Sequence, residues 1–111
     1  YRVVESEVMQ FHAEMCSGLA DPVRLMLIYE LGNGPKKVNE LVKALDLSQP
    51  SVSRQLKILR DRGLVANERK GNCMVYSLVD KRLLHALDEL RQVMRDIINR
   101  RSAIIEAYSK D

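Results

Sequence analysis

Two short helical segments near the middle of the chain, separated by only a few residues, constrain the fold most. The first segment ends near Asp46, and Ser48 then begins the second, because a serine oxygen accepts N–H groups of the first turn and Pro50 fits that turn. The second segment stops before Gly63, which suits the left-handed position beyond a helix. The apolar residues of the first segment are Val38, Leu41, Val42 and Leu45, and those of the second are Val52, Leu56 and Leu59. Their spacing predicts two amphipathic helices joined by a turn of about three or four residues, a helix-turn-helix over residues 36–62.

Two more helices are expected before this motif. Residues 3–18 carry an apolar stripe with glutamates elsewhere, which predicts a first helix. Asp21 followed by Pro22 predicts the start of a second, and residues 32–35 (Gly-Asn-Gly-Pro) end it. The stripe of the first helix is Val4, Val8, Phe11 and Met15, and that of the second is Val23, Leu27 and Leu31.

A β-hairpin is expected after the motif, over residues 64–78. Residues 64–69 and 73–78 are short strand-like runs, and Lys70, Gly71 and Asn72 lie between them as the turn. If Met74, Tyr76 and Leu78 point inward, Cys73 lies on the exposed face near basic residues. The hairpin is the predicted wing.

The last predicted helix covers residues 80–109 and is long for so small a chain. Its apolar stripe is Leu83, Leu84, Leu87, Leu90, Met94, Ile97, Ile98, Ile104, Ile105 and Tyr108. A small domain cannot cover that much apolar surface, so part of the stripe is expected to meet a second copy of the chain. The predicted fold is therefore mainly α with a small β-hairpin, in the order four helices, two strands, one helix, and residues 1–111 form a single winged helix-turn-helix domain.

Composition and charge bound the function. The chain is 46% hydrophobic and 30% charged, as an ordinary globular protein is. It has no apolar run of about 18 residues and no signal-peptide pattern, so no membrane association and a cytoplasmic location are expected. Residues 36–82 hold eleven Lys and Arg against five Asp and Glu, although the whole chain is only +3. The middle of the chain is where an anionic partner is expected to bind.

Groove-reading side chains gather on the polar face of the second helix of the motif, mostly in its first two turns. Glutamine can pair with adenine and arginine with guanine, serine can donate or accept, and lysine neutralises phosphate. The side chains are Gln49, Ser51, Ser53, Arg54 and Lys57. Further basic residues, expected to reach flanking phosphates or a minor groove, are Arg60, Arg62, Arg69 and Lys70. These residues predict binding to double-stranded DNA.

Three segments resemble the ArsR/SmtB family of winged helix-turn-helix transcriptional repressors. They are LADPVRL at residues 19–25, LSQPSVSRQLK at residues 47–57 and GNCMVYSL at residues 71–78. The resemblance covers nearly the whole chain. It implies a homodimer with the first and last helices at the interface, bound to an imperfect palindrome and released by an inducer. It also matches Gln49, Ser51, Ser53 and Arg54 to base-reading positions and Arg69, Lys70 and Asn72 to the wing.

The sequence departs from the sensing sites of that family. Lys37 and Asn39 stand where the family's thiolate site has Cys-x-Cys, so neither can supply a thiolate. The family's zinc site matches Asp80, Arg82, Val93 and Asp96, which lack imidazoles and include a repelling arginine. Tyr29 stands where sulfide-sensing members have a reactive cysteine. No metal ligand set and no cofactor are predicted, and the inducer stays unidentified.

Cys16 and Cys73 are the two soft ligands or redox handles of the chain, and therefore its candidate sensor residues. For Cys16 the ordinary expectation is a buried small hydrophobe. The alternative is a sensor in which the two thiols, most naturally from different chains, form a disulfide, a persulfide bridge or a soft-metal or metalloid site. His12 lies four residues before Cys16 and could share its helix face as a third metal ligand. His85 is instead expected to pack or to be solvated on the last helix.

The sequence favours one of three classes of function. The favoured one is a sequence-specific DNA-binding transcriptional regulator, a repressor released by an inducer acting through the interface helices. The alternative is a winged-helix module that binds protein, which usually loses the basic recognition face that this chain keeps. An enzyme is not expected, because Cys-x-x-Cys and a glycine-rich phosphate loop are absent and the sequence indicates no nucleophile with an organised base.

Overall fold

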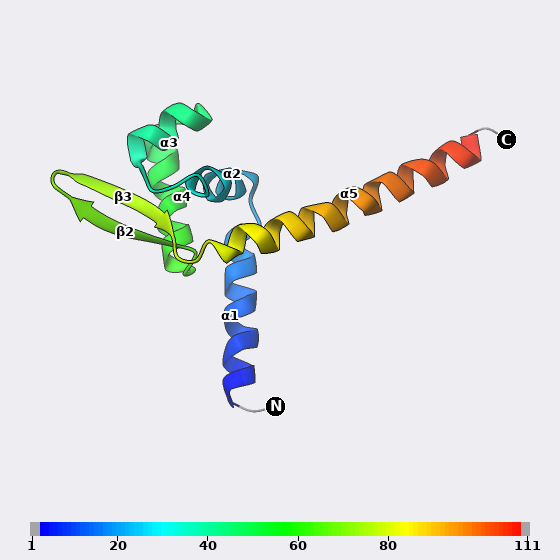
Figure 1. The fold of residues 1–111 in the computed structure, drawn as a ribbon, viewed down its shortest axis with the longest axis horizontal. Coiled ribbons are helices and arrows are strands. Elements are labelled where there is room, and N and C mark those ends of the chain that lie inside the picture. The colour runs from blue at the N-terminus through cyan, green and yellow to red at the C-terminus, as the bar shows by residue number, and fades with distance from the viewer. Residues whose placement is uncertain (1–2, 110–111) are drawn as a thin grey trace. The chain divides into compact units, whose positions relative to one another are not determined.

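The structure is a computed structural model that describes residues 3–109, and these residues form the predicted helices and strands in the predicted order, with one additional short strand (Figure 1). The elements are α1 (Val3–Leu19), α2 (Pro22–Leu31), β1 (Lys36–Lys37), α3 (Val38–Leu45), α4 (Gln49–Asp61), β2 (Val65–Lys70), β3 (Cys73–Leu78) and α5 (Arg82–Ser109). The chain divides into two units, one ending at Asp80 and one beginning at Lys81. The mainly helical fold class is confirmed.

The predicted helix starts are formed by the expected caps. Asp21 Oδ1 accepts hydrogen bonds from the backbone N–H of Val23 at 2.8 Å and of Arg24 at 3.2 Å. Ser48 Oγ accepts from the backbone N–H of Ser51 at 3.3 Å, at the start of α4. Because the first N–H groups of a helix have no partner within the helix, these side chains decide where α2 and α4 begin.

The core of the first unit lies between α2, α3, α4 and the start of β2. Its buried members are Leu27, Ile28, Leu31, Leu41, Val52, Leu56, Leu59, Leu64 and Val65. The predicted stripe of α4 is buried throughout, whereas the predicted stripes of α2 and α3 are buried only in part, because Val23, Val38, Val42 and Leu45 are half-buried. The three buried residues of α4 recur at the helical repeat. Burying this face turns the polar face of α4 outward.

The wing is part of a three-stranded antiparallel sheet in the order β1-β3-β2, whereas the sequence predicted a hairpin alone. The third strand is the two-residue β1, in which Lys36 pairs with Tyr76 and Lys37 with Val75. A strand of two residues is too short to show an alternating pattern in the sequence. It is a strand only because it pairs with β3.

The hairpin turn is also tighter than predicted. Lys70 pairs with Cys73 as the last residue of β2, which leaves Gly71 and Asn72 as a two-residue turn. Gly71 has φ +63°, a conformation that glycine adopts without strain.

The predicted facing of β3 is wrong at its tip. Met74 is exposed rather than inward, and Cys73 is half-buried rather than exposed. β1 flanks β3 only at Val75 and Tyr76, so the strand beyond them has no third strand beside it. Residues 75–78 are half-buried.

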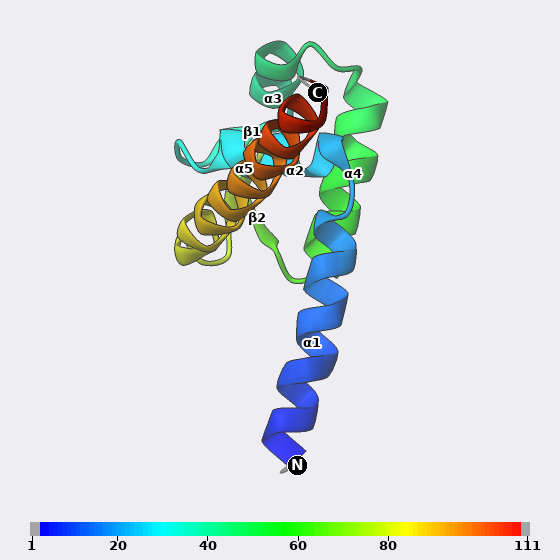
Figure 2. The ribbon, with the colours of Figure 1, turned by 90° about the vertical axis from the view of Figure 1, so that its right-hand side faces the viewer.

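The last turn of α1 is fixed against the turn between α4 and β2. A Cβ added to buried Gly18 would lie 2.9 Å from Leu64 Cδ1, and one added to Gly63 would lie 3.0 Å from Cζ of Phe11. The N-terminal turns of α1 project away from the other helices of this unit (Figure 2). The predicted stripe of α1 is therefore split: Met15 is half-buried, whereas Val4, Val8 and Phe11 are exposed.

The second unit contains the 28-residue helix α5, which begins two residues later than the sequence predicted and ends where predicted. Much of its predicted apolar stripe is exposed, and so is Val93 beside it: the exposed stripe residues are Leu90, Met94, Ile98, Ile104, Ile105 and Tyr108. Within residues 3–109, neither this helix nor any other has the length and apolar character needed to cross a membrane.

Candidate nucleic-acid interface

The polar face of α4 carries the residues that the sequence selected as groove-reading. Gln49, Arg54 and Lys57 are exposed, and Ser51 and Ser53 are half-buried. The opposite face is anchored by Val52, Leu56 and Leu59, each fully buried. The helix therefore presents these polar groups from a fixed surface.

The first two turns of α4 are locally ordered. Gln49 Nε2 donates a hydrogen bond to Ser53 Oγ at 3.0 Å, so two of the predicted base-reading residues interact one helical turn apart. The helix N-terminus carries a partial positive charge and unpaired N–H groups, which favour an anion nearby. No Asp or Glu lies in the first turn of α4, so no side-chain carboxylate there competes with such an anion.

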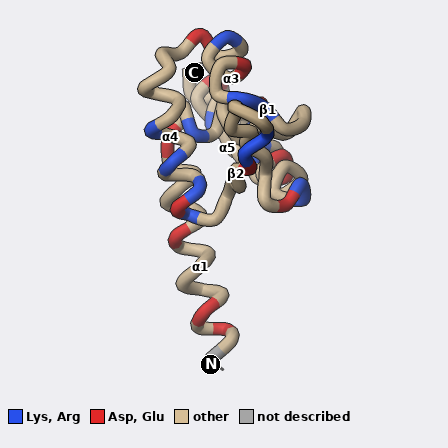
Figure 3. Tube along the Cα trace, turned by 90° about the vertical axis from the view of Figure 1, so that its left-hand side faces the viewer, with Lys and Arg blue, Asp and Glu red and all other residues tan. Residues whose placement is uncertain are grey.

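The tip of the wing is basic and exposed. Arg69 and Lys70 end β2, Asn72 lies in the turn, and all three are exposed. Figure 3 marks Lys and Arg positions along α4 and around β1, whereas the described part of α1 carries acidic positions and no basic ones. Apart from Arg24 on α2, the basic residues in the described part of the first unit are therefore gathered on the helix-turn-helix and the sheet.

The structure adds two basic residues that the sequence reasoning had not placed. Strand β1 sets Lys36 and Lys37 on the outer edge of the sheet, beside β3. The feature of the sequence that could have indicated these two residues is the Lys-Lys pair directly before the start of α3. Of the two arginines expected near flanking phosphates, Arg60 has its Nε 3.9 Å from Asp61 Oδ1, and Arg62 is exposed.

The candidate sensor cysteines lie on different elements. Cys16 is exposed on α1, so the expectation that it is a buried core residue is wrong for the single chain. Cys73 is half-buried at the start of β3, and both thiols are free. Within residues 3–109, the structure has no group of three or more His, Cys, Asp or Glu side chains able to hold a metal ion. A role for the two thiols in sensing stays a prediction.

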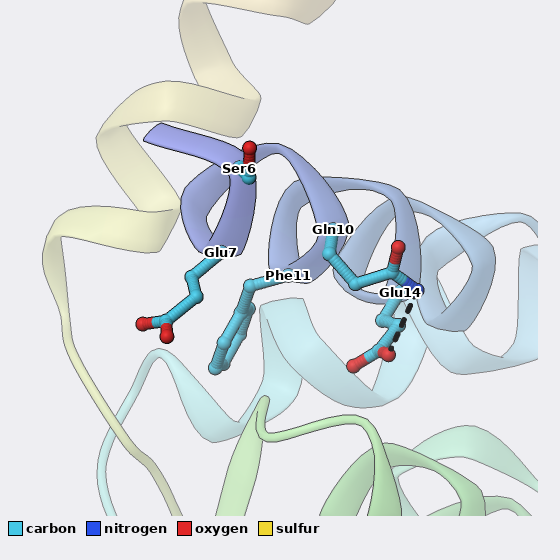
Figure 4. Close-up of a pocket in the computed structure, with 5 residues that line it drawn as sticks. All are labelled: Ser6, Glu7, Gln10, Phe11 and Glu14. Atoms are coloured by element: carbon cyan, nitrogen blue, oxygen red, sulfur yellow. Dashed lines mark hydrogen bonds between the residues drawn. The ribbon is translucent and has the colours of Figure 1, made fainter. Parts of the chain in front are cut away.

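A shallow depression lies along α1, lined by Ser6, Glu7, Gln10, Phe11 and Glu14 (Figure 4). Its volume is about 340 Å³, and Gln10 Nε2 donates to Glu14 Oε1 at 3.4 Å within it. All of its lining residues belong to one helix, whereas pockets for small molecules are concave sites that surround most of the ligand. We therefore treat it as part of the exposed surface of α1.

Comparison with known proteins places this arrangement in a family. The family model described as "Bacterial regulatory protein, arsR family" matches residues 21–67, from the cap of α2 into the wing. The HTH-type transcriptional regulator NmtR of Mycobacterium tuberculosis is 41% identical over 86 residues, which are 78% of this chain and 72% of NmtR. The chain belongs to the ArsR family of bacterial regulatory proteins. The resemblance inferred from residues 19–25, 47–57 and 71–78 is confirmed.

Two further relatives of this ArsR-family chain support the same assignment. The HTH-type transcriptional repressor SmtB of Mycobacterium tuberculosis is 39% identical over 93 residues, covering 83% of this chain and 69% of SmtB. The homodimeric winged helix-turn-helix DNA-binding domain of Mb0332 from Mycobacterium bovis superposes with a TM-score of 0.77 over 90% of this chain and 93% of that domain. At 19% identity, the latter match supports the winged helix-turn-helix fold. These relatives of the chain are thus named as transcriptional regulators.

Proposed function

We propose that this chain is a sequence-specific repressor of transcription that binds double-stranded DNA as a homodimer. The observation that carries the proposal is the exposed polar face of α4, whose opposite face is locked into the core. A helix presented in this way enters the major groove with its N-terminal residues at the base edges. Family members named as regulators and repressors support the proposal, because such proteins act by binding DNA.

Base recognition is assigned to the first two turns of α4. Arg54 can donate two hydrogen bonds to guanine O6 and N7, and Gln49 can pair with adenine N6 and N7. Ser51 and Ser53 donate or accept, and Lys57 neutralises phosphate. In the free protein Gln49 bonds to Ser53, so this bond exchanges for base contacts on binding.

The wing is assigned to the DNA backbone. Arg69, Lys70 and Asn72 are exposed at the end of a two-residue turn, which is narrow enough to follow a groove edge. Contacts to phosphate position the protein without carrying sequence information. The wing therefore contributes affinity and register, and α4 contributes specificity.

The homodimer is assigned to α1 and α5. Val8 is 55% exposed and Ile98 is 58% exposed, so apolar surface on both helices faces solvent in the single chain. Exposed apolar surface of this kind on a helix marks an interaction site, and a second copy of the same chain covers it by two-fold symmetry. The homodimeric domain of Mb0332, which has the same fold, supports this proposal. Two α4 helices would then contact an imperfect palindrome, and an inducer that shifts the interface would release it.

The proposal is tested by selecting duplexes from a pool with a randomised core and measuring affinity for the enriched sequence by fluorescence anisotropy. Arg54→Ala is expected to lower that affinity by about 1–3 kcal/mol and to relax base preference at one position of each half-site. A control variant, Asn99→Ala, changes an exposed residue of α5 and should leave both properties unchanged.

The competing function, a winged-helix module that binds protein, gives a different result. Such a module enriches no sequence and shows no affinity for random duplex even at low salt. Either finding with folded wild-type protein would overturn the proposed function.

A further inference from the structure

The guanidinium of Arg24 lies where the end of α1, the start of α2 and the middle of α4 meet. Its Nε donates a hydrogen bond to the carbonyl oxygen of Gly18 at 2.6 Å. Its Nη1 donates another to Oε1 of Gln55 at 2.9 Å. One half-buried side chain of α2 therefore connects the last turn of α1 to the proposed recognition helix.

The bridge connects two elements that are packed against the core. Gly18 is buried, and a Cβ there would lie 2.9 Å from Leu64 Cδ1, so the carbonyl that accepts from Nε belongs to a tightly packed turn. Arg24 is itself held at the start of α2, because its backbone N–H donates to Oδ1 of Asp21. Gln55 follows directly after Arg54, and its neighbour Leu56 is fully buried. The bridge thus joins the packed last turn of α1 to a half-buried glutamine side chain on α4, a helix anchored in the core.

The chemistry of arginine makes this link directional. The guanidinium is planar, and its donors point in fixed directions, so bonding two acceptors at once fixes their relative position. Because arginine has donors only, the atom of Gln55 that it contacts must be the amide oxygen. A lysine ammonium has no such rigid fork and cannot define the same geometry.

We propose that Arg24 is a positioning residue for DNA recognition, which holds α4 at a fixed orientation to the end of α1. The inference rests on the proposed function of α4. Base contacts tolerate errors of only about half an ångström, whereas the general attraction of a basic surface to phosphate tolerates much larger ones. Loss of the bridge should therefore impair binding to a selected sequence and spare binding to random DNA.

The test compares two probes, a duplex enriched from the random pool by the wild-type protein and a random-sequence duplex of equal length. Arg24→Met keeps the aliphatic stem and removes both hydrogen bonds. We expect it to lower affinity for the enriched duplex by about 10-fold and to change affinity for the random duplex by less than about twofold. Because no phosphate contact is lost, the dependence of binding on salt should keep its slope.

Three further variants distinguish loss of the hydrogen-bond geometry of Arg24 from loss of its charge and from a failure of the protein to fold. Arg24→Lys keeps the charge without the fork, and it should lose most of the specific affinity. Gln55→Met cuts only the half of the bridge that reaches α4, so it decides the question even if Arg24→Met does not fold. In the Arg24→Met, Gln55→Met double variant the loss should equal that of Arg24→Met alone, since Arg24→Met already removes the hydrogen bond that Gln55 accepts.

Several results would overturn the inference. The first is unchanged affinity for the enriched duplex in folded Arg24→Met or Gln55→Met, and the second is full retention of that affinity in Arg24→Lys. The third is an equal loss of affinity for both duplexes, with a salt slope shallower by about one. That result would make Arg24 a phosphate contact. Failure of the proposed function looks different, because the wild-type protein itself would then enrich no sequence.

Discussion

At the scale of single residues, the structure shows how little space separates α1 from the rest of its unit. Gly18 is buried, with Leu64 and the stem of Arg62 directly beside it. Its carbonyl also accepts the short hydrogen bond from Arg24. A glycine in a helix is normally a weakness, because it costs about 1 kcal/mol relative to alanine. Here the close approach of α1 to the turn after α4 requires it.

Gly18→Ala should therefore destabilise the protein despite the better helix propensity of alanine. The new Cβ would lie 2.9 Å from Leu64 Cδ1 and 3.1 Å from Cβ of Arg62, and Leu64 is only 1% exposed, so its side chain can shift only by disturbing the packing around it. We expect a net loss of about 1–2 kcal/mol in the free energy of unfolding, measured by denaturant titration. Ser17→Ala, at an exposed neighbouring position of α1, is the control and should change stability little. Equal stability of Gly18→Ala and wild type would show that α1 is not held at this turn.

The two cysteines give a second prediction at this scale. If the thiols sense the inducer, a Cys16→Ser, Cys73→Ser double variant should bind the enriched duplex as wild type does but no longer release it on treatment with oxidant, persulfide or arsenite. Cys16 is exposed, so reagents can reach it in the single chain. The measurement is anisotropy with and without each reagent, combined with the intact mass of the same samples. A variant that still responds fully would remove the thiol hypothesis.

At the scale of elements, the start of α4 depends on one side chain. Ser48 Oγ accepts the backbone N–H of Ser51, and this cap fixes the turn that presents Gln49 and Arg54. Ser48→Ala should lower the free energy of unfolding by about 1 kcal/mol, because an N–H of the first turn loses its partner. Ser48→Asp keeps an acceptor and should retain the stability. A fully stable Ser48→Ala variant would mean that the cap does not determine where α4 begins.

The wing gives a prediction that contrasts with that for Arg54. Lys70 is exposed at the end of β2, so it is assigned to phosphate rather than to a base. Lys70→Ala should weaken binding to enriched and random duplexes alike and make the slope of log affinity against log salt shallower by about 0.9, whereas Lys70→Arg should keep the slope. A loss restricted to the enriched sequence would instead assign Lys70 to base recognition.

The elements also show what sequence could predict and what it could not. The helices were predictable because Asp21, Ser48 and Gly63 mark their ends and the apolar spacing marks their buried faces. Strand β1 was not, because two residues acquire strand structure only when β3 lies beside them. The prediction that Met74 points inward was wrong for a related reason. The alternation of residues along β3 does not indicate that its third-strand neighbour, β1, reaches only as far as Val75. The exposed face of α4 was predictable because the apolar spacing identified its buried face. The hydrogen bond between Arg24 and Gln55 was not predictable, because it joins residues 31 positions apart and corresponds to no local pattern in the sequence.

At the scale of the whole molecule, the exposed stripe of α5 is the part of the chain that a single copy leaves unexplained. Ile98 is 58% exposed, and Asn99 next to it is an exposed polar residue of the same helix. Ile98→Glu should give a monomer at micromolar concentration in sedimentation velocity, because it would bury an unpaired charge in the interface. Asn99→Glu is the matched control and should remain dimeric. If Ile98→Glu stays dimeric with unchanged affinity, α5 is not the interface.

The measurement that tests the central claim most directly is the stoichiometry and sequence symmetry of the DNA complex. Native mass spectrometry of wild-type protein on its enriched duplex should find two chains per duplex. The enriched sequence should contain two inverted half-sites whose centres lie about 10 base pairs or one helical turn apart, as expected when two α4 helices enter successive major grooves. One chain bound to a single, asymmetric site would contradict the account.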